Sequence, residues 1–289
     1  MGGSGLYDMD GLTDREEVEL RTPFGAPSDA IVLGALGETR VAFLPRHGRG
    51  HVLSPSRIPV RANIYALKSL GVERIVSISA VGSLKEEVRP LDLVVPDQLM
   101  DRTYARDATF FDDGIVGHVA FARPFCPDLS REVAAAAERQ GVTTHVGGAC
   151  VVIEGPQFST RAESELYRSW GGSIVGMTAL PEAKLAREAE ICYATMAFVT
   201  DYDCWHDDEE SVSVDLIVAN LNRNVATAQA VIGEVVARQG IDQGIDRECA
   251  CAEALKGAII TSPERITEEV RQRLSLIVGE YLSVAREVV

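Results

Sequence analysis

Short apolar runs alternate with amphipathic helical patterns along most of this chain, and this alternation constrains its fold more than any other feature. Apolar runs that predict buried strands lie at 30–36, 40–45, 74–80, 92–96, 142–155, 173–177 and 191–199. Patterns that predict helices lie at 60–71, about 129–139, 161–171, 181–190, about 213–238 and about 264–288. Strands that alternate with helices are typical of an α/β domain, so we predict a central mixed β-sheet flanked by helices on both faces.

The composition argues against several classes of partner. The chain has 289 residues and a net charge of −15, which disfavours broad binding to nucleic acid or to an anionic membrane. It contains no apolar run of about 18 residues or more, so no membrane span is predicted. Its first residues, "MGGSGLYDMD", lack the basic and apolar regions of a signal peptide, so we expect a cytoplasmic location.

A Gly- and Asp-rich connection between the last two predicted helices is the one plausible break in the chain. We therefore predict a main domain over 1–240 and a C-terminal extension over 241–289. The extension contains the segment "CAC" (249–251) and the final helix.

The six cysteines are scattered along the sequence, which favours buried thiols in a reducing compartment. Cys249 and Cys251 cannot easily form a relaxed disulfide with each other. They could form a strained, redox-labile one, bond to Cys192 or Cys204, or remain free. We expect a disulfide to this segment only if the protein comes from a thermophile.

Three glycine-rich segments at the ends of predicted strands carry side chains suited to an anion. "PRHGRGH" (45–51) places Arg46 and His47 directly after a strand, where arginine matches phosphate oxygens and glycine lets backbone N–H groups approach. "SAVGSL" (79–84) and "GGSG" (2–5) predict two further turns with hydroxyls. Each segment alone is most often a solvated turn, but the three together favour a phosphate site.

"TDYDCW" (200–205) follows the apolar run "ICYATMAFV" and places two carboxylates, Asp201 and Asp203, at the end of a predicted core strand. On an extended chain both side chains face the same side. Apolar surroundings and a second carboxylate raise the pKa of at least one of them, and a protonated carboxylic acid can donate a hydrogen bond to a ring nitrogen. The alternative is that they cap the helix that follows.

The loop in "VIEGPQFSTRAES" (152–164) offers two further residues. Glu154 is expected to act as a cap or a turn partner. Phe158 is either a core side chain or a stacking platform for a flat base.

The chain contains, in this order, the motifs "GGSGLY", "RHGRGH", "SAVGSL", "DRT", "PFCP", "EGPQFSTRAES", "GMT", "PEAKLAREAEICYA" and "TDYDCW". Together they resemble the trimeric purine nucleoside phosphorylase family, and within it the members that act on 5′-methylthioadenosine, over about residues 2–238. The resemblance implies an α/β fold of the nucleoside phosphorylase type. "CACAEALKGAIIT" and the final helix are similar to a C-terminal extension of some bacterial and archaeal members.

The resemblance implies phosphorolysis of 5′-methylthioadenosine to adenine and 5-methylthioribose 1-phosphate, a step of methionine and purine salvage. Inorganic phosphate would be the co-substrate, and no metal or organic cofactor would be needed. The resemblance also implies a homotrimer or homohexamer that acts on a small nucleoside.

Individual site residues also follow from the resemblance. The residues implied to hold phosphate are Ser4, Arg46, His47, Ser79, Ala80 and Thr178. Those implied to contact the nucleoside are Met177 at the ribose, Phe158 and Ser159 at the base, Val214 and Ile217 at the methylthio group, and Asp201 and Asp203 at the purine edge. His118 would reach the sugar pocket of a neighbouring subunit.

Phosphorolysis breaks a C–N glycosidic bond through a cation-like sugar, in the way that glycosidases break C–O bonds. The leaving purine gathers negative charge at N7, and an acid at that atom accelerates the reaction by about two to four orders of magnitude. We expect Asp203 to supply the proton and Asp201 to accept a hydrogen bond from the 6-amino group.

Three other functions are weighed against this one. A phosphorylase of 6-oxopurine nucleosides or of 5′-methylthioinosine is disfavoured by Asp rather than Asn at the purine edge. A nucleosidase that uses water is disfavoured by Arg46 and His47, and a non-catalytic nucleoside-binding protein is disfavoured by the full set of polar positions.

The chain departs from the family at Met1, which stands almost on the Gly-rich turn. We expect an upstream in-frame start that encodes a short Val/Ile-rich strand.

Overall fold

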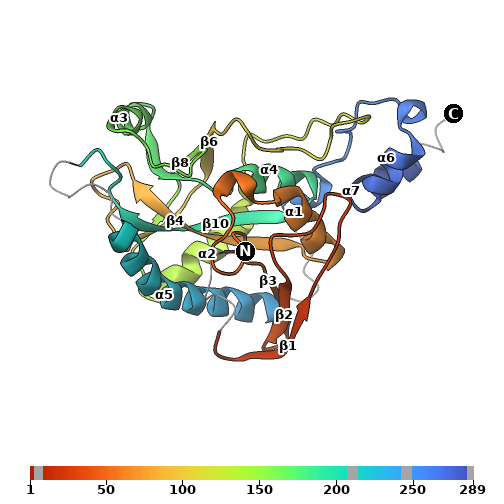
Figure 1. The fold of residues 1–289 in the computed structure, drawn as a ribbon. Coiled ribbons are helices and arrows are strands. Elements are labelled where there is room, and N and C mark those ends of the chain that lie inside the picture. The colour runs from red at the N-terminus through yellow and green to blue at the C-terminus, as the bar shows by residue number, and fades with distance from the viewer. Residues whose placement is uncertain (3–8, 207–213, 242–248, 285–289) are drawn as a thin grey trace.

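The computed structural model describes residues 1–2, 9–206, 214–241 and 249–284 (Figure 1). Its strands are β1 (Leu12–Val18), β2 (Ile31–Leu36), β3 (Thr39–Phe43), β4 (Arg74–Ser83), β5 (Leu93–Val95), β6 (Gln98–Arg102), β7 (Thr144–Val146), β8 (Ala149–Ile153), β9 (Gly172–Gly176) and β10 (Cys192–Asp201). Its α-helices are α1 (Val60–Ser69), α2 (Pro127–Arg139), α3 (Arg161–Ser169), α4 (Ala179–Glu188), α5 (Val214–Ile241), α6 (Glu268–Arg273) and α7 (Ser275–Val284).

The central sheet has seven strands in the order β6-β8-β9-β4-β10-β5-β7. Strand β10 runs parallel to β4 and antiparallel to β5, and β4 runs antiparallel to β9, so the sheet is mixed. Strands β1, β2 and β3 form a separate antiparallel sheet, at the lower right of Figure 1. The predicted fold class is confirmed.

Strand β10 separates the core into two layers. All of its residues are buried. Side chains such as Tyr193 and Val199 pack with α1 and α4, whereas Met196 and Phe198 pack with α2 and α5. Figure 1 shows these two pairs of helices on opposite sides of the sheet. Such alternation with a period of two residues is what a strand buried on both faces requires.

Several elements differ from the sequence-based prediction. Strand β1 was not predicted, because it is a charged, mostly exposed edge strand without an apolar period. Strand β6 was not predicted either. The run 142–155 forms two strands, because Gly147 and Gly148 adopt positive φ angles of 90° and 97° between them. The predicted final helix is interrupted at Leu274, which separates α6 from α7.

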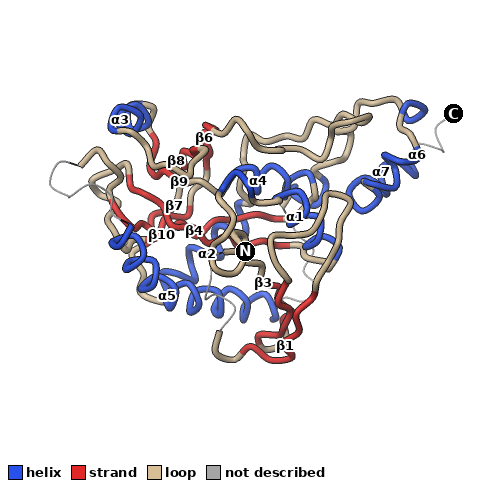
Figure 2. The backbone as a smooth tube through the Cα atoms, in the orientation of Figure 1, coloured by secondary structure: helices blue, strands red, loops and turns tan. Residues whose placement is uncertain are grey.

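The C-terminal segment packs against the main body of the protein. Val270, Leu274 and Val278 belong to the same apolar core as α1 and α4. The long loop between β6 and α2 runs out to this segment (Figure 2), and the His118 N–H donates to the Ala258 carbonyl at 2.9 Å. The predicted boundary at 240 precedes residues 242–248, which lie outside the described part. None of the described helices combines the length and apolar content that a bilayer crossing requires.

A buried carboxylate anchors this C-terminal segment. Glu190, 8% exposed, accepts hydrogen bonds from the Leu255 N–H at 3.0 Å and from the Tyr281 hydroxyl at 2.6 Å. We expect Tyr281→Phe to lower the free energy of unfolding by about 1–3 kcal/mol, because it removes a donor from a buried carboxylate. Urea denaturation measures the change. Tyr104→Phe, at a side chain that is 86% exposed, is the matched control; equal losses in both variants would contradict the role of Tyr281.

Candidate active site

A cavity of about 400 Å³ opens where β4, β9 and β10 end. It brings together most of the site residues predicted from the sequence: Arg46, His47, Ser79, Ala80, Phe158, Ser159, Met177, Thr178, Asp201 and Asp203. These residues come from segments that are far apart in the sequence. A concave site with a few convergent polar groups is what a small-molecule ligand needs.

The other predicted residues are not part of this lining. Ser4 lies outside the described residues. Val214 and Ile217 lie in the first turns of α5, and their side chains are outside the described part of the structure. His118 is exposed on the loop between β6 and α2, away from the cavity lining. Its contact with a neighbouring subunit stays a prediction.

Arg46 borders the cavity, yet its guanidinium is held by the protein interior. Its Nε donates to the Glu182 carboxylate at 2.7 Å, Nη1 donates to the Ile78 carbonyl at 2.7 Å, and Nη2 donates to the Ser77 hydroxyl at 2.6 Å. The side chains of Arg46 and Glu182 are only 2% and 1% exposed. Sequence reasoning missed Glu182, which looked like one charged position in an amphipathic helix. A phosphate contact through the Arg46 guanidinium stays a prediction.

His47 is neutral near pH 7 in this arrangement. Its Nδ1 lies 2.8 Å from the Leu53 carbonyl, so Nδ1 carries the ring proton. Burial lowers the pKa of His47 from 6.5 to about 4; the hydrogen bond to Leu53 opposes this shift, and the positive charge of Arg46 adds to it. A bound anion would favour the imidazolium form. The ring can therefore gain a positive charge when phosphate binds.

Ser79 on β4 and Thr178 just before α4 place two hydroxyls side by side. Ser79 Oγ and Thr178 Oγ1 are 2.9 Å apart, so one of them donates to the other. A hydroxyl has one proton and two lone pairs, so the pair keeps a donor for an anion. With His47 nearby in the lining, this part of the cavity is the best suited to phosphate.

Polar atoms without a partner mark another part of the cavity. Ser159 Oγ and Asn224 Nδ2 are enclosed, and neither has a hydrogen-bond partner among the described residues. Both residues line the cavity, beside Phe158, which is 46% exposed and thus not a core side chain. Because buried polar groups are nearly always hydrogen-bonded, these atoms are candidates for ligand contacts. Sequence reasoning missed Asn224, which is one of several polar positions in α5.

Strand β10 delivers Asp201 and Asp203 to the cavity, where they are 5% and 8% exposed. A bulge shifts the register with β4 between Val199 and Asp201, and bulges re-aim the side chains that follow. The Asp201 carboxylate accepts hydrogen bonds from the Thr200 hydroxyl at 2.7 Å and from the Asp203 N–H at 2.8 Å. The chain turns at Asp203, whose φ is 53°. The extended geometry expected for this pair is therefore wrong: Asp201 holds the turn that places Asp203.

The two carboxyl groups differ in their surroundings. Burial raises the pKa of Asp203; the nearby Ser164 hydroxyl opposes this shift, and the charge of Asp201 adds to it. A carboxyl group with a raised pKa keeps its proton to higher pH. Asp203 is therefore the better candidate for a proton donor.

Gly82 on β4 pairs with Asp201 and allows the two acids to approach the strand. A Cβ at position 82 would lie 3.0 Å from Asp201 Oδ1 and 3.2 Å from Asp203 Cβ. Such contacts are tighter than ordinary van der Waals packing. The glycine of "SAVGSL" thus serves close packing within a strand, which corrects the turn predicted from the sequence.

Arg106 holds the backbone of two segments that line the cavity. Its guanidinium donates to the carbonyls of Met177, Leu180 and Glu154, each at 2.6 Å. The Glu154 carboxylate accepts from the Tyr104 N–H at 2.7 Å, so Glu154 acts as a loop partner. Sequence reasoning missed Arg106, because these acceptors lie 48 to 74 positions away from it.

A larger cavity of about 710 Å³ lies between β2, β3, α1 and α5, next to Met1. Its lining includes apolar side chains such as Leu67, Ile75 and Val235 and none of the hydroxyls and acids described above. That lining also includes charged and hydroxyl residues such as Glu38, Thr39 and Arg40, but the buried acids Asp201 and Asp203 line only the smaller of the two cavities. We therefore place the candidate active site there.

Residues 1–237 match the family model described as the phosphorylase superfamily. The chain belongs to this superfamily. Its convergent cavity, on a mixed sheet with helices on both faces, is thus the expected place for phosphorylase chemistry.

Relatives within the superfamily share one printed name. S-methyl-5′-thioadenosine phosphorylase from Geobacter sulfurreducens is 55% identical over 283 residues, 98% of each chain. The enzyme of that name from Koribacter versatilis is 55% identical over 281 residues, 97% of this chain and 95% of the relative. Among solved structures, a methylthioadenosine phosphorylase from an antarctic soil metagenomic library has a TM-score of 0.90 and 50% identity, with 96% of each chain covered. A mutant adenosine/methylthioadenosine phosphorylase from Schistosoma mansoni, in complex with adenine, has a TM-score of 0.81 and 34% identity.

The close packing at Gly82 predicts a loss of catalysis in Gly82→Ala. We expect kcat of phosphorolysis to fall about tenfold or more, because the added methyl group displaces both carboxylates by a few tenths of an ångström from their positions. Steady-state kinetics measure this effect. Gly233→Ala in α5 is the control, because nothing lies within 4 Å of its added Cβ. An unchanged kcat in Gly82→Ala would show that the acids do not depend on this contact.

Proposed function

We propose that the protein cleaves S-methyl-5′-thioadenosine with inorganic phosphate and releases adenine and 5-methylthioribose 1-phosphate. The observation that carries the proposal is the single cavity that joins a hydroxyl and histidine region to two buried carboxylates. The names of relatives at 55% identity over nearly the whole chain support the same substrate.

In the proposed reaction, a phosphate oxygen forms a bond to the sugar C1′ from one face while the C1′–N9 bond to adenine breaks on the other. The hydroxyl pair of Ser79 and Thr178 donates its remaining proton to a phosphate oxygen, and His47 balances the anionic charge. The electrons of the broken bond go to the purine, which gathers negative charge at N7. The Asp203 carboxyl group donates its proton to N7, so adenine leaves as a neutral base.

Asp201 sets the preference for an amino group on the purine. Its carboxylate, which accepts hydrogen bonds from Thr200 and Asp203, is an acceptor that suits a 6-amino group. A 6-oxo group would instead place an oxygen against this carboxylate. This mismatch disfavours the alternative function, phosphorolysis of 6-oxopurine nucleosides or of 5′-methylthioinosine.

Further properties belong to the proposal. The reaction uses phosphate as a co-substrate and needs no metal or organic cofactor. We expect a cytoplasmic homotrimer or homohexamer in which His118, and the side chains of Val214 and Ile217, complete the sugar and methylthio pockets.

Substitution of each acid separates their roles. Asp203→Asn should lower kcat about 100-fold or more with little change in KM for the nucleoside, because an amide transfers no proton. Asp201→Asn should instead reduce the ratio of kcat/KM for 5′-methylthioadenosine to kcat/KM for 5′-methylthioinosine. The measurement is kcat/KM for both nucleosides, with and without phosphate, in the three proteins. Equal use of both nucleosides by the unmodified protein, or release of adenine without phosphate, would overturn the proposal.

The raised pKa of Asp203 predicts the pH dependence. The acid must be protonated to work, so kcat should be retained below its pKa and should fall as the pH rises through it. The pH profile of kcat measures this decline. The residual activity of Asp203→Asn should not decline in this pH range. A decline that persists in the variant would assign the titration to another group.

The hydroxyl pair predicts a selective defect in phosphate binding. Ser79→Ala removes one donor to a charged ligand, which should raise KM for phosphate about tenfold or more while KM for the nucleoside changes little. Ser169→Ala, at an exposed serine of α3, is the control. A rise in KM for the nucleoside alone would show that Ser79 does not contact phosphate.

A further inference from the structure

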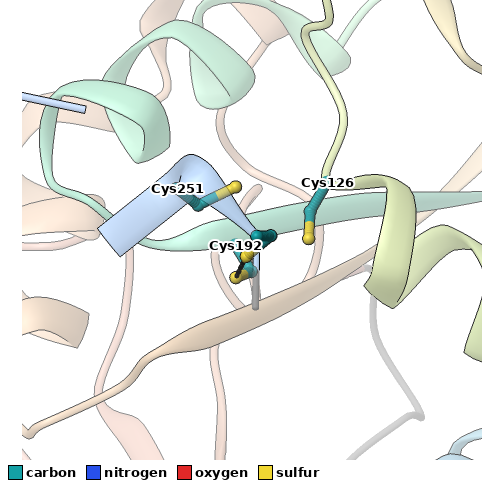
Figure 3. A group of neighbouring side chains, drawn as sticks. Cys126, Cys192 and Cys251 are labelled. Carbon is teal, nitrogen blue, oxygen red and sulfur yellow. Dashed lines mark hydrogen bonds between the residues drawn. The ribbon is translucent and has the colours of Figure 1, made fainter. Parts of the chain in front are cut away.

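Four of the six cysteines converge at the end of β10 that lies opposite the acids. Cys126 is the N-cap of α2, Cys192 begins β10, and Cys249 and Cys251 lie in and beside a short 3-10 turn (Ala250–Glu253). Their Sγ atoms all lie within 4.8 Å of one another. Figure 3 shows Cys126, Cys192 and Cys251 meeting from three separate elements. The scattered distribution along the sequence had concealed this cluster.

The cluster lies in the apolar layer between α2, α5 and the sheet. Cys126, Cys192 and Cys251 are buried at 1%, 2% and 4% exposure, and Cys249 packs against the same core. Cys150, by contrast, is buried in β8, where desolvation raises its pKa to about 12. Cys204 donates to the Ser159 carbonyl beside the active site. The four clustered thiols therefore form a set of their own.

The geometry of the set favours one shared partner over separate pairs. In a tetrahedral zinc site the Zn–S bonds of about 2.3 Å place the sulfurs about 3.8 Å apart. Four sulfurs that all lie within 4.8 Å of one another fit that arrangement. Two disulfides would instead draw the sulfurs into two bonded pairs, and Cys249 and Cys251 cannot form a relaxed bond with each other.

The surroundings also suit thiolates. Cys126 stands at the start of α2, a helix of 13 residues whose first turn presents backbone N–H groups. Thiolate ligands of structural zinc accept hydrogen bonds from such backbone groups, and soft thiolates in a closed, apolar set select zinc over hard cations.

We propose that Cys126, Cys192, Cys249 and Cys251 bind one Zn²⁺ ion through their four sulfur atoms. Each thiol releases its proton as its sulfur coordinates, so binding releases protons and involves no oxidation or reduction. Four protein ligands complete the tetrahedron and leave no position for a water or substrate. The ion is therefore structural. It lies about 30 Å from the acids along β10, at about 3.3 Å per residue, and is independent of the proposed reaction.

The ion would join the C-terminal segment to the main body. Cys249 and Cys251 stand just before the stretch in which Ala258 accepts from the His118 N–H and Ile260 N–H donates to the Val116 carbonyl. Packing, the hydrogen bonds of this stretch and of Glu190, and those from Arg273 to the Asp112 and Asp113 carbonyls also hold the segment. Metal binding should thus stabilise the segment more than the sheet.

The test is metal content, measured by inductively coupled plasma mass spectrometry on the full chain purified without chelator. We expect about one zinc per chain, at least tenfold less in the double variant Cys249→Ser/Cys251→Ser, and an unchanged content in Cys150→Ala. A zinc-free protein, or copper or iron in place of zinc, would overturn the proposal. Equal zinc in the double variant would also overturn it.

Two measurements on the unmodified protein do not depend on the folding of the variants. Replacement of the bound metal by Co²⁺ should give the thiolate charge-transfer bands and intense d–d absorption bands of a tetrahedral sulfur site. The absence of these bands would contradict the proposed zinc site. Thiols are also counted in denaturant with chelator and without reductant. Six free thiols are expected, whereas four or two would establish disulfides in place of the metal site.

Discussion

The burial of β10 on both faces is the constraint on which the rest of the structure depends. Its backbone is paired with β4 on one side and β5 on the other, and its side chains alternate between two helical layers. A strand so enclosed cannot slip by one residue without exchanging its two faces. Both ends of the strand are therefore fixed in space: Cys192 at one end and Asp201 at the other.

Buried charges connect this strand to the cavity. Glu182 accepts from Arg46, Ser77 and Tyr193, so a single carboxylate on α4 joins the loop after β3, strand β4 and strand β10. Arg106 donates to the Glu154 and Met177 carbonyls and forms an ion pair with the Glu154 carboxylate at 3.4 Å. Removal of one member of such a buried pair leaves an uncompensated charge, which is strongly destabilising. These pairs hold the lining of the cavity in place before any ligand arrives.

The sequence predicted the elements whose apolar pattern is strong and missed those without one. The runs at 30–36 and 191–199 became β2 and β10 nearly as expected, whereas β1 has charged side chains and an open edge. Most of the predicted site residues meet in one cavity, because they lie at or just after the ends of strands. Arg46 and His47 follow β3 of the small sheet, whereas residues such as Thr178 and Asp203 follow strands of the central sheet.

The remaining site features depend on partners far away along the chain. Nothing near Arg106 in the sequence indicates that it holds Met177, and nothing near Glu182 indicates Arg46 as its partner. The turn at Asp203 depends on a hydrogen bond to Asp201 and on a bulge in β10, neither of which an apolar pattern records. The cysteine cluster likewise arises from positions between 126 and 251 that only the fold brings together.

The contact between Gly82 and the two acids has a consequence for divergence within the superfamily. The acids at 201 and 203 line the candidate active site, so a change of substrate can be met by changing them. Residue 82 faces the side chains of both acids, and a Cβ there would make contacts tighter than ordinary packing whichever base is bound. The residue at position 82 is therefore constrained by the packing of the site, whereas the residues at 201 and 203 are constrained by its substrate. Related chains that bind different purines should differ at the latter and agree at the former.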